Sequence, residues 1–113
     1  MASALEFAEQ LGKAISESAQ ALALREARKA MNAQPEILAA LKDYQSHAHK
    51  LGELEHAGKP IEVADKHKLQ ELQQKLLAFD AFKKFTAKQV DYVDLMRQVN
   101  DVIRKHLTGT ERD

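Results

Sequence analysis

Apolar residues recur every three or four positions along most of the chain, the spacing that places side chains on one face of an α-helix. The first series begins at Leu5, where Ser3 and Glu6 have the spacing of a helix-capping box. The hydroxyl groups of Ser16 and Ser18 compete for backbone hydrogen bonds, so we expect a bend or short break there. A second helix is then expected to reach about residue 31.

Proline and glycine mark the ends of the next helix. Proline is tolerated in the first turn of a helix, so a third helix is expected to begin at Pro35. Gly58 suits a left-handed C-terminal cap, and Pro60 prevents continuation. A fourth helix follows from Glu62. The apolar stripe of the third helix comprises Ile37, Leu38, Leu41, Tyr44, Ala48 and Leu51.

The longest pattern begins near Asp80, which either caps a new helix or lies in a tight bend. From there nothing interrupts a helix before Leu107, and a helix of that length would measure about 42 Å at 1.5 Å per residue. We therefore predict an all-α protein of about five helices, an antiparallel bundle with a long C-terminal helix. Residues 3–107 are expected to form a single helical domain, and residues 108–113 a frayed polar tail.

The C-terminal stripe is longer than a compact domain of this size normally buries. Either the N-terminal helix packs along all of it or another subunit covers the remainder. We expect a homo-oligomer, with a dimer favoured, and a protein partner. The residues predicted to form this oligomer or partner interface are Phe82, Phe85, Tyr92, Met96, Val99 and Ile103.

Composition narrows the possible classes of protein. The 113 residues include no cysteine, which excludes disulfide scaffolds, thiolate metal sites and cysteine nucleophiles. The 17 basic and 17 acidic side chains balance, which weakens any case for nucleic-acid binding by bulk charge. No apolar run is long enough to span a membrane and no secretory signal is visible, so a cytoplasmic location is expected.

Signatures of catalysis are missing from the sequence. There is no glycine-rich phosphate loop and no metalloprotease or serine-hydrolase motif. Asp43 and His47 have the i,i+4 spacing of a carboxylate that orients an imidazole, but this pair is common on ordinary helix surfaces. His47 and His49 point away from each other on a helix. We expect no enzyme activity, no metal site and no cofactor.

Lysines alternate with aromatic residues near the start of the long helix. Lys83, Lys84 and Lys88 could contact phosphate while Phe82 and Phe85 stack on bases, which makes an RNA-contacting accessory factor the alternative function. Because both rings lie on the apolar stripe, burial of the rings with the lysines in solvent is favoured. Direct contact with nucleic acid is therefore not the leading expectation.

Several core and turn segments resemble the YlbF/YmcA/YheA family of small helical bacterial proteins, over roughly residues 4–107. These segments read LGKAISES (residues 11–18), QPEI (34–37), LEHAGKP (54–60), LQQKL (72–76) and FDAFKKF (79–85). The last is similar to the family's Asn-Pro-x-Ile-Lys-x-Tyr turn, with Phe79 and Asp80 in place of Asn-Pro. This departure suggests a divergent member, nearer to the uncharacterised YheA branch.

The resemblance implies an all-helical protein, dimeric or larger, without enzymatic activity. Better-understood members act as protein partners in a complex that influences competence, sporulation and biofilm development and assists the endoribonuclease RNase Y in RNA maturation. Members of that complex have been linked to iron–sulfur binding through cysteines. Because this chain has no cysteine, that cofactor is not carried over. The function expected is a non-enzymatic helical adaptor that acts through self-association and protein contacts.

Overall fold

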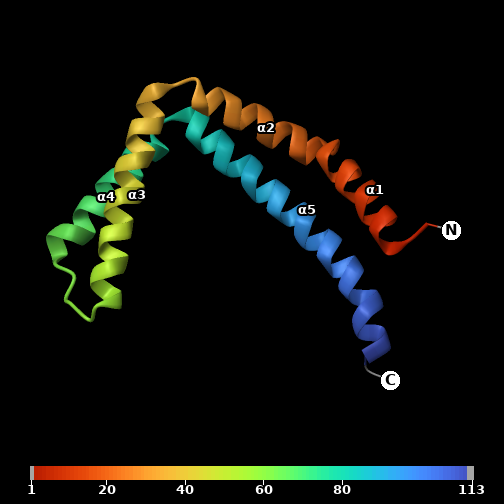
Figure 1. Ribbon diagram of the computed structural model, residues 1–113. Coiled ribbons are helices and arrows are strands. Elements are labelled where there is room, and N and C mark those ends of the chain that lie inside the picture. Colours follow the sequence, from red (N-terminus) through yellow and green to blue (C-terminus); the bar gives the residue numbers. More distant parts are fainter. Residues whose placement is uncertain (1, 112–113) are drawn as a thin grey trace. The chain divides into compact units, whose positions relative to one another are not determined.

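The computed structural model describes residues 2–111, with side chains described up to Leu107. Five α-helices and no strand occupy this part of the chain, which confirms the all-α prediction (Figure 1). In chain order they are α1 (Ala4–Ser16), α2 (Ala19–Asn32), α3 (Pro35–His56), α4 (Val63–Leu77) and α5 (Asp80–Glu111).

Two compact units divide these helices. Unit 1 consists of the described residues up to Ala27 and those from Thr86 onward, and unit 2 consists of residues Arg28–Phe85. Helices α2 and α5 therefore each begin in one unit and end in the other. The expectation of one helical domain over residues 3–107 stays a prediction. Over the described residues, no helix combines the length and apolarity needed to cross a membrane.

Serine side chains set the helix starts in unit 1. The Ser3 hydroxyl accepts a hydrogen bond from the backbone N–H of Glu6 at 3.2 Å, which confirms the predicted cap of α1. The Ser18 hydroxyl accepts from the N–H of Ala21 at 3.1 Å and donates to the carbonyl of Ile15 at 2.6 Å. Ser18 thus caps α2 while satisfying a carbonyl at the end of α1, and the predicted break at this position is confirmed.

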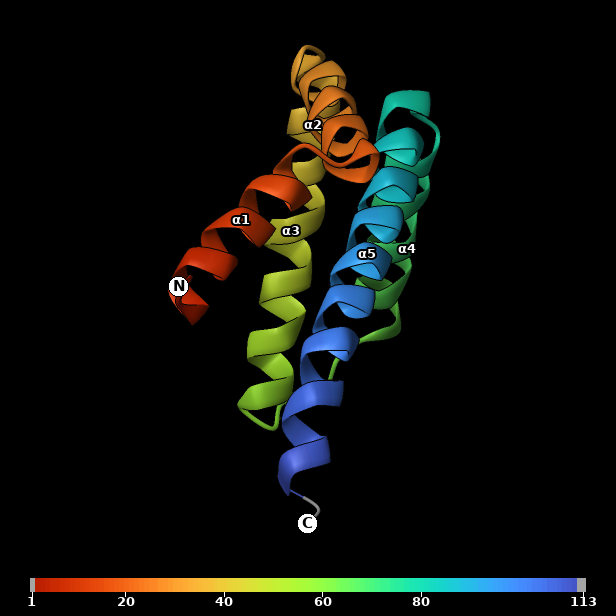
Figure 2. The same ribbon diagram turned by 90° about the vertical axis from the view of Figure 1, so that its right-hand side faces the viewer.

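Helices α3 and α4 of unit 2 pack side by side as an antiparallel hairpin (Figures 1 and 2). The turn after α3 is set by Gly58, whose φ of +72° lies in the left-handed region. The N–H of Lys59 donates to the carbonyl of Leu54 at 2.9 Å, and the N–H of Gly58 donates to that of Glu55 at 3.1 Å. These two bonds form a Schellman motif, and the left-handed C-terminal cap predicted at Gly58 is confirmed.

Two glycines of this hairpin are expected to respond oppositely to alanine. Gly58→Ala should lower the free energy of unfolding by about 1–2 kcal/mol, because an alanine Cβ is strained at positive φ. Gly52→Ala should raise it by about 0.5–1 kcal/mol, because Gly52 lies inside α3 and an added Cβ would meet open space. Urea denaturation followed by circular dichroism measures both changes, and equal shifts in one direction would contradict the turn geometry.

The core of unit 2 joins all of its helices. Its buried residues are Met31, Ile37, Ala40 and Leu76, and Ile37 is fully buried at 0% exposure. The partly buried residues that pack against them are Leu41, Tyr44, Phe79, Ala81, Phe82 and Phe85. An aliphatic core therefore forms around the start of α3, and aromatic rings from α3, the α4–α5 turn and the start of α5 pack against it.

Helix α5 begins at Asp80, so this residue starts the helix rather than lying in a bend outside it. The N–H groups of Phe82 and Lys83 both donate to the carbonyl of Phe79 at 3.1 Å, which places Phe79 at the cap. The helix reaches Glu111, beyond the predicted end at Leu107. Residues 112–113 of the predicted frayed tail lie outside the described residues.

Candidate functional site

The predicted interface stripe on α5 is divided between the two units. Phe82 and Phe85, at its start, are half-buried against the core cluster of unit 2. Their rings thus have a role within their own chain, as the burial interpretation of the sequence favoured. Tyr92, Met96 and Val99 are half-buried in unit 1, whereas Ile103 is 44% exposed.

Apolar residues of unit 1 become exposed toward the free end of α5. Val102 is 60% exposed and Leu107 is 59% exposed, and every residue from 101 to 107 is exposed. Ile103 and Leu107 are four positions apart, so they continue the covered stripe into solvent. Residues 101–107 of α5 therefore present largely exposed apolar side chains.

Helix α1 is also poorly covered. None of its residues is buried, and Leu5 and Phe7 are 80% and 59% exposed. Its pattern is nevertheless amphipathic, because Leu11 and Ile15 on the apolar side are half-buried. Large exposed apolar side chains at this density are typical of surfaces that bind another protein. We define the apolar face of unit 1 as Leu5, Phe7, Val102, Ile103 and Leu107.

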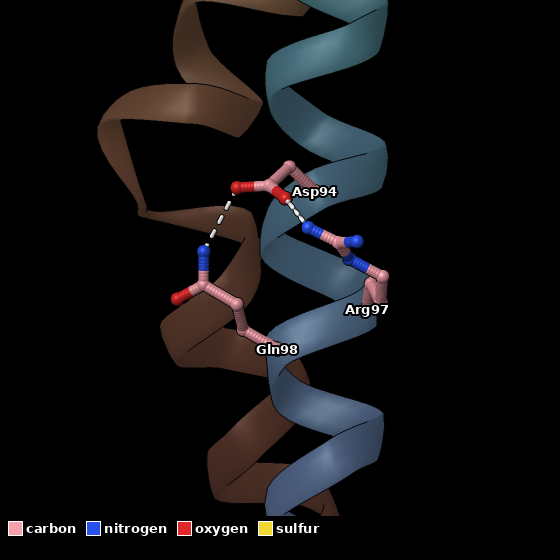
Figure 3. A network of polar contacts seen from close by, with 3 residues as sticks. All are labelled: Asp94, Arg97 and Gln98. Carbon is pink, nitrogen blue, oxygen red and sulfur yellow. Dashed lines mark hydrogen bonds and ion pairs between the residues drawn. The ribbon is translucent and has the colours of Figure 1, made fainter.

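A small polar network lies on α5, in unit 1. Asp94 accepts hydrogen bonds from the guanidinium of Arg97 and from the side-chain amide of Gln98, the latter at 2.8 Å (Figure 3). The hydrogen bond from Arg97, followed by that from Gln98, lowers the pKa of the Asp94 carboxyl below its usual value of 3.8. Both spacings are those of neighbours on one helix face, so the network stabilises the helix locally.

The lowered pKa of Asp94 leads to a test by pH titration. A carboxyl with a depressed pKa in the folded helix contributes stability above its unfolded pKa and loses it as pH falls through the folded value. Carbon-detected NMR is expected to show Asp94 titrating below pH 3.8. Arg97→Gln should move the midpoint upward because it removes the largest cause. An Asp94 titration midpoint that is unchanged in the Arg97→Gln variant would contradict the role of this network.

The lysines predicted as a possible nucleic-acid contact differ in solvent exposure. Lys83 and Lys84 are exposed, and Lys88 is half-buried. Within unit 2, the guanidinium carbon of Arg28 lies 5.7 Å from the centre of the Phe85 ring, within the range of a cation–π contact. One face of the Phe85 ring is thus occupied by the chain's own arginine.

Among the described residues, no group of three or more histidine and acidic side chains is placed to hold a metal ion. The Nε2 atom of His47 lies 2.9 Å from the backbone carbonyl oxygen of Asp65, so this nitrogen donates and links α3 to the first turn of α4. Asp43 lines the same shallow depression as His47. His49 pairs with Glu53 at 2.9 Å on the exposed side of α3. These contacts are those of structural and surface histidines.

Comparison with known proteins adds a family to this geometry. The family model described as "Control of competence regulator ComK, YlbF/YmcA" matches residues 4–108. This protein belongs to the YlbF/YmcA family. No curated protein matches the chain. The YlbF/YmcA match covers all of α1–α4 and most of α5, so both units and the apolar face of unit 1 lie largely within the region that defines the family.

Two features of this YlbF/YmcA chain were not found from the sequence. Ala40 is 1% exposed in the core of unit 2. Its burial was not predicted because the weak hydrophobicity of alanine does not distinguish this residue from the other alanines of the chain. The contact between Arg28 and Phe85 joins residues far apart in sequence, and no local pattern indicates it. Leu107, in contrast, had a usable signal, because it lies four residues after Ile103 on the same face.

Proposed function

We propose that this YlbF/YmcA family protein is a non-enzymatic helical adaptor that acts by self-association and by binding a protein partner in a regulatory assembly. The observation that carries the proposal is the apolar face of unit 1, which stays exposed on a chain whose family is linked to control of the competence regulator ComK.

The binding free energy that burial of the apolar face supplies can be compared with that required for a stable dimer. Covering the exposed half of a Val, Ile or Leu side chain gives about 1 kcal/mol. Val102, Ile103 and Leu107 in two copies therefore supply about 6 kcal/mol before association costs of at least about 4 kcal/mol, whereas a micromolar dimer needs a net of about 8 kcal/mol. Leu5 and Phe7 are the most exposed apolar residues of α1 and offer the remaining area. The proposed interface thus includes α1 as well as the end of α5.

Light scattering coupled to size-exclusion chromatography tests the self-association. The mass is expected to exceed that of the 12.7-kDa chain at micromolar concentrations and to fall on dilution. A monomer throughout the micromolar range would refute self-association. The partner is tested separately by cross-linking the untagged protein in its native cells, with a variant altered in the apolar face as the matched control.

Regulation of competence is the first proposed setting, because the family is described by its control of a competence regulator. Sporulation and RNase Y-dependent RNA maturation are further proposed settings, which rest on the resemblance to better-understood members. An adaptor acting in this setting requires no cofactor and no chemistry of its own. Loss of the chain in its native organism is expected to change one of these processes. Restoration by the wild-type chain, but not by a variant altered in the apolar face, would support the adaptor mechanism.

A further inference from the structure

Basic side chains gather where the end of α2 meets the start of α5 in unit 2. Arg28 and Lys29 lie near the end of α2, and the Arg28 guanidinium lies 5.7 Å from the Phe85 ring centre on α5. Lys84 is the residue next to Phe85. All three side chains are exposed. We name Arg28, Lys29 and Lys84 the basic patch.

The cations of the basic patch lack acidic partners over the described residues. Farther along α5, Arg97 pairs with Asp94 and Arg104 pairs with Asp101. No ion pair of this kind involves the three residues of the basic patch. Residues 27–35 and 81–90 contain no acidic residue. The acidic residues that bound these two segments are Glu26, Glu36, Asp80 and Asp91. Glu26 lies three positions before Lys29, a spacing that allows a helical ion pair, but the structure shows no ion pair between them.

The helix dipole explains the position of only some of the cations in the basic patch. A cation in the last turn of α2 is favoured by the negative end of the helix dipole, which is sufficient to explain Lys29. Lys84 lies near the start of α5, where the dipole favours negative charge instead. The intrahelical ion pairs that stabilise the later part of α5 do not involve Lys84. Asp80, four positions before Lys84, has the spacing of a helical ion pair, but the structure shows no ion pair between them, so the Lys84 ammonium is available to another anion.

We propose that the basic patch binds an acidic segment of a partner protein, an inference that rests on the proposed adaptor function. Charge complementarity is the argument, because the exposed cations of the basic patch form no ion pair within the described residues and attract a chain of carboxylates. Single-stranded RNA is the less suitable occupant. Its bases need exposed aromatic faces, whereas Phe82 is half-buried in the core and Arg28 covers Phe85.

Fluorescence anisotropy with a fluorescein-labelled peptide of alternating Glu and Ser tests the proposal. At low ionic strength the wild-type chain is expected to bind it, and added salt should weaken the binding. Lys29→Gln combined with Lys84→Gln should weaken it about tenfold, since each exposed ion pair contributes a few-fold. Circular dichroism checks that the double variant keeps its helices.

Lys42→Gln combined with Lys66→Gln is the matched control, because both lysines are exposed in unit 2 and the net charge changes equally. Equal weakening by the two double variants, or no binding by the wild type, would overturn the proposal. Tighter, salt-dependent binding of labelled oligouridylate would replace it with an RNA site. Light scattering keeps the two proposals separate, because losing peptide binding should leave the mass unchanged.

Discussion

Replacing Ile37 with alanine is expected to lower the free energy of unfolding by about 2–5 kcal/mol. Ile37 is fully buried at the start of α3, where it packs with Met31, Ala40 and Leu76. Truncation leaves a cavity in a core that has few other large aliphatic side chains. Because small proteins are stable by only about 5–15 kcal/mol, this loss is a large share of the total. Urea denaturation followed by circular dichroism measures it.

Leu38 provides the matched control for this truncation. It is adjacent to Ile37 on the same helix and of similar size, but it is 40% exposed. Leu38→Ala should therefore cost about 1 kcal/mol or less, because much of its side chain already contacts water. If the two alanine variants lost equal stability, the core of unit 2 would not be centred on Ile37.

Replacing Ile103 with aspartate is expected to weaken self-association on the order of 30-fold or more. The side chain is 44% exposed between Val102 and Leu107, so a carboxylate is tolerated in the single chain. Within an apolar interface the same carboxylate would be buried without a partner, which is costly. Sedimentation or light scattering across the micromolar range measures the shift toward the mass of one chain.

Val90→Asp is the control for this interface substitution. Val90 is 67% exposed on α5 but lies roughly 140° around the helix axis from Ile103. Its replacement adds the same charge to the same helix and is expected to leave the mass unchanged. Dissociation by Val90→Asp, with none by Ile103→Asp, would place any interface on a different face and refute the one proposed.

Local signals explain why the helices could be predicted from the sequence. Ser3, Ser18, Pro35 and Gly58 act on backbone groups within a few residues, so each helix boundary they set is visible without knowledge of the fold. The predicted end of α5 at Leu107 was too early, because the polar residues that follow have no apolar periodicity although the helix continues to Glu111.

Burial was harder to predict than helix boundaries, because one apolar stripe can be covered by different neighbours along its length. Phe82 and Ile103 belong to the same periodic series, yet the first packs on the core of unit 2 and the second is 44% exposed. Likewise, the lysines beside Phe85 were visible, but the arginine that completes the basic patch comes from α2. Such differences depend on tertiary contacts that periodicity does not encode.

The uneven covering of α5 has a consequence for its motion. Its first turns pack on buried side chains, whereas residues 101–107 are all exposed. Backbone amides along this single helix should therefore exchange with deuterium slowly at the start and quickly toward the end. A protein that covers the last turns would slow their exchange, and part of its binding free energy would be used to order them. Protection of these amides thus reports directly on occupancy of the helix end.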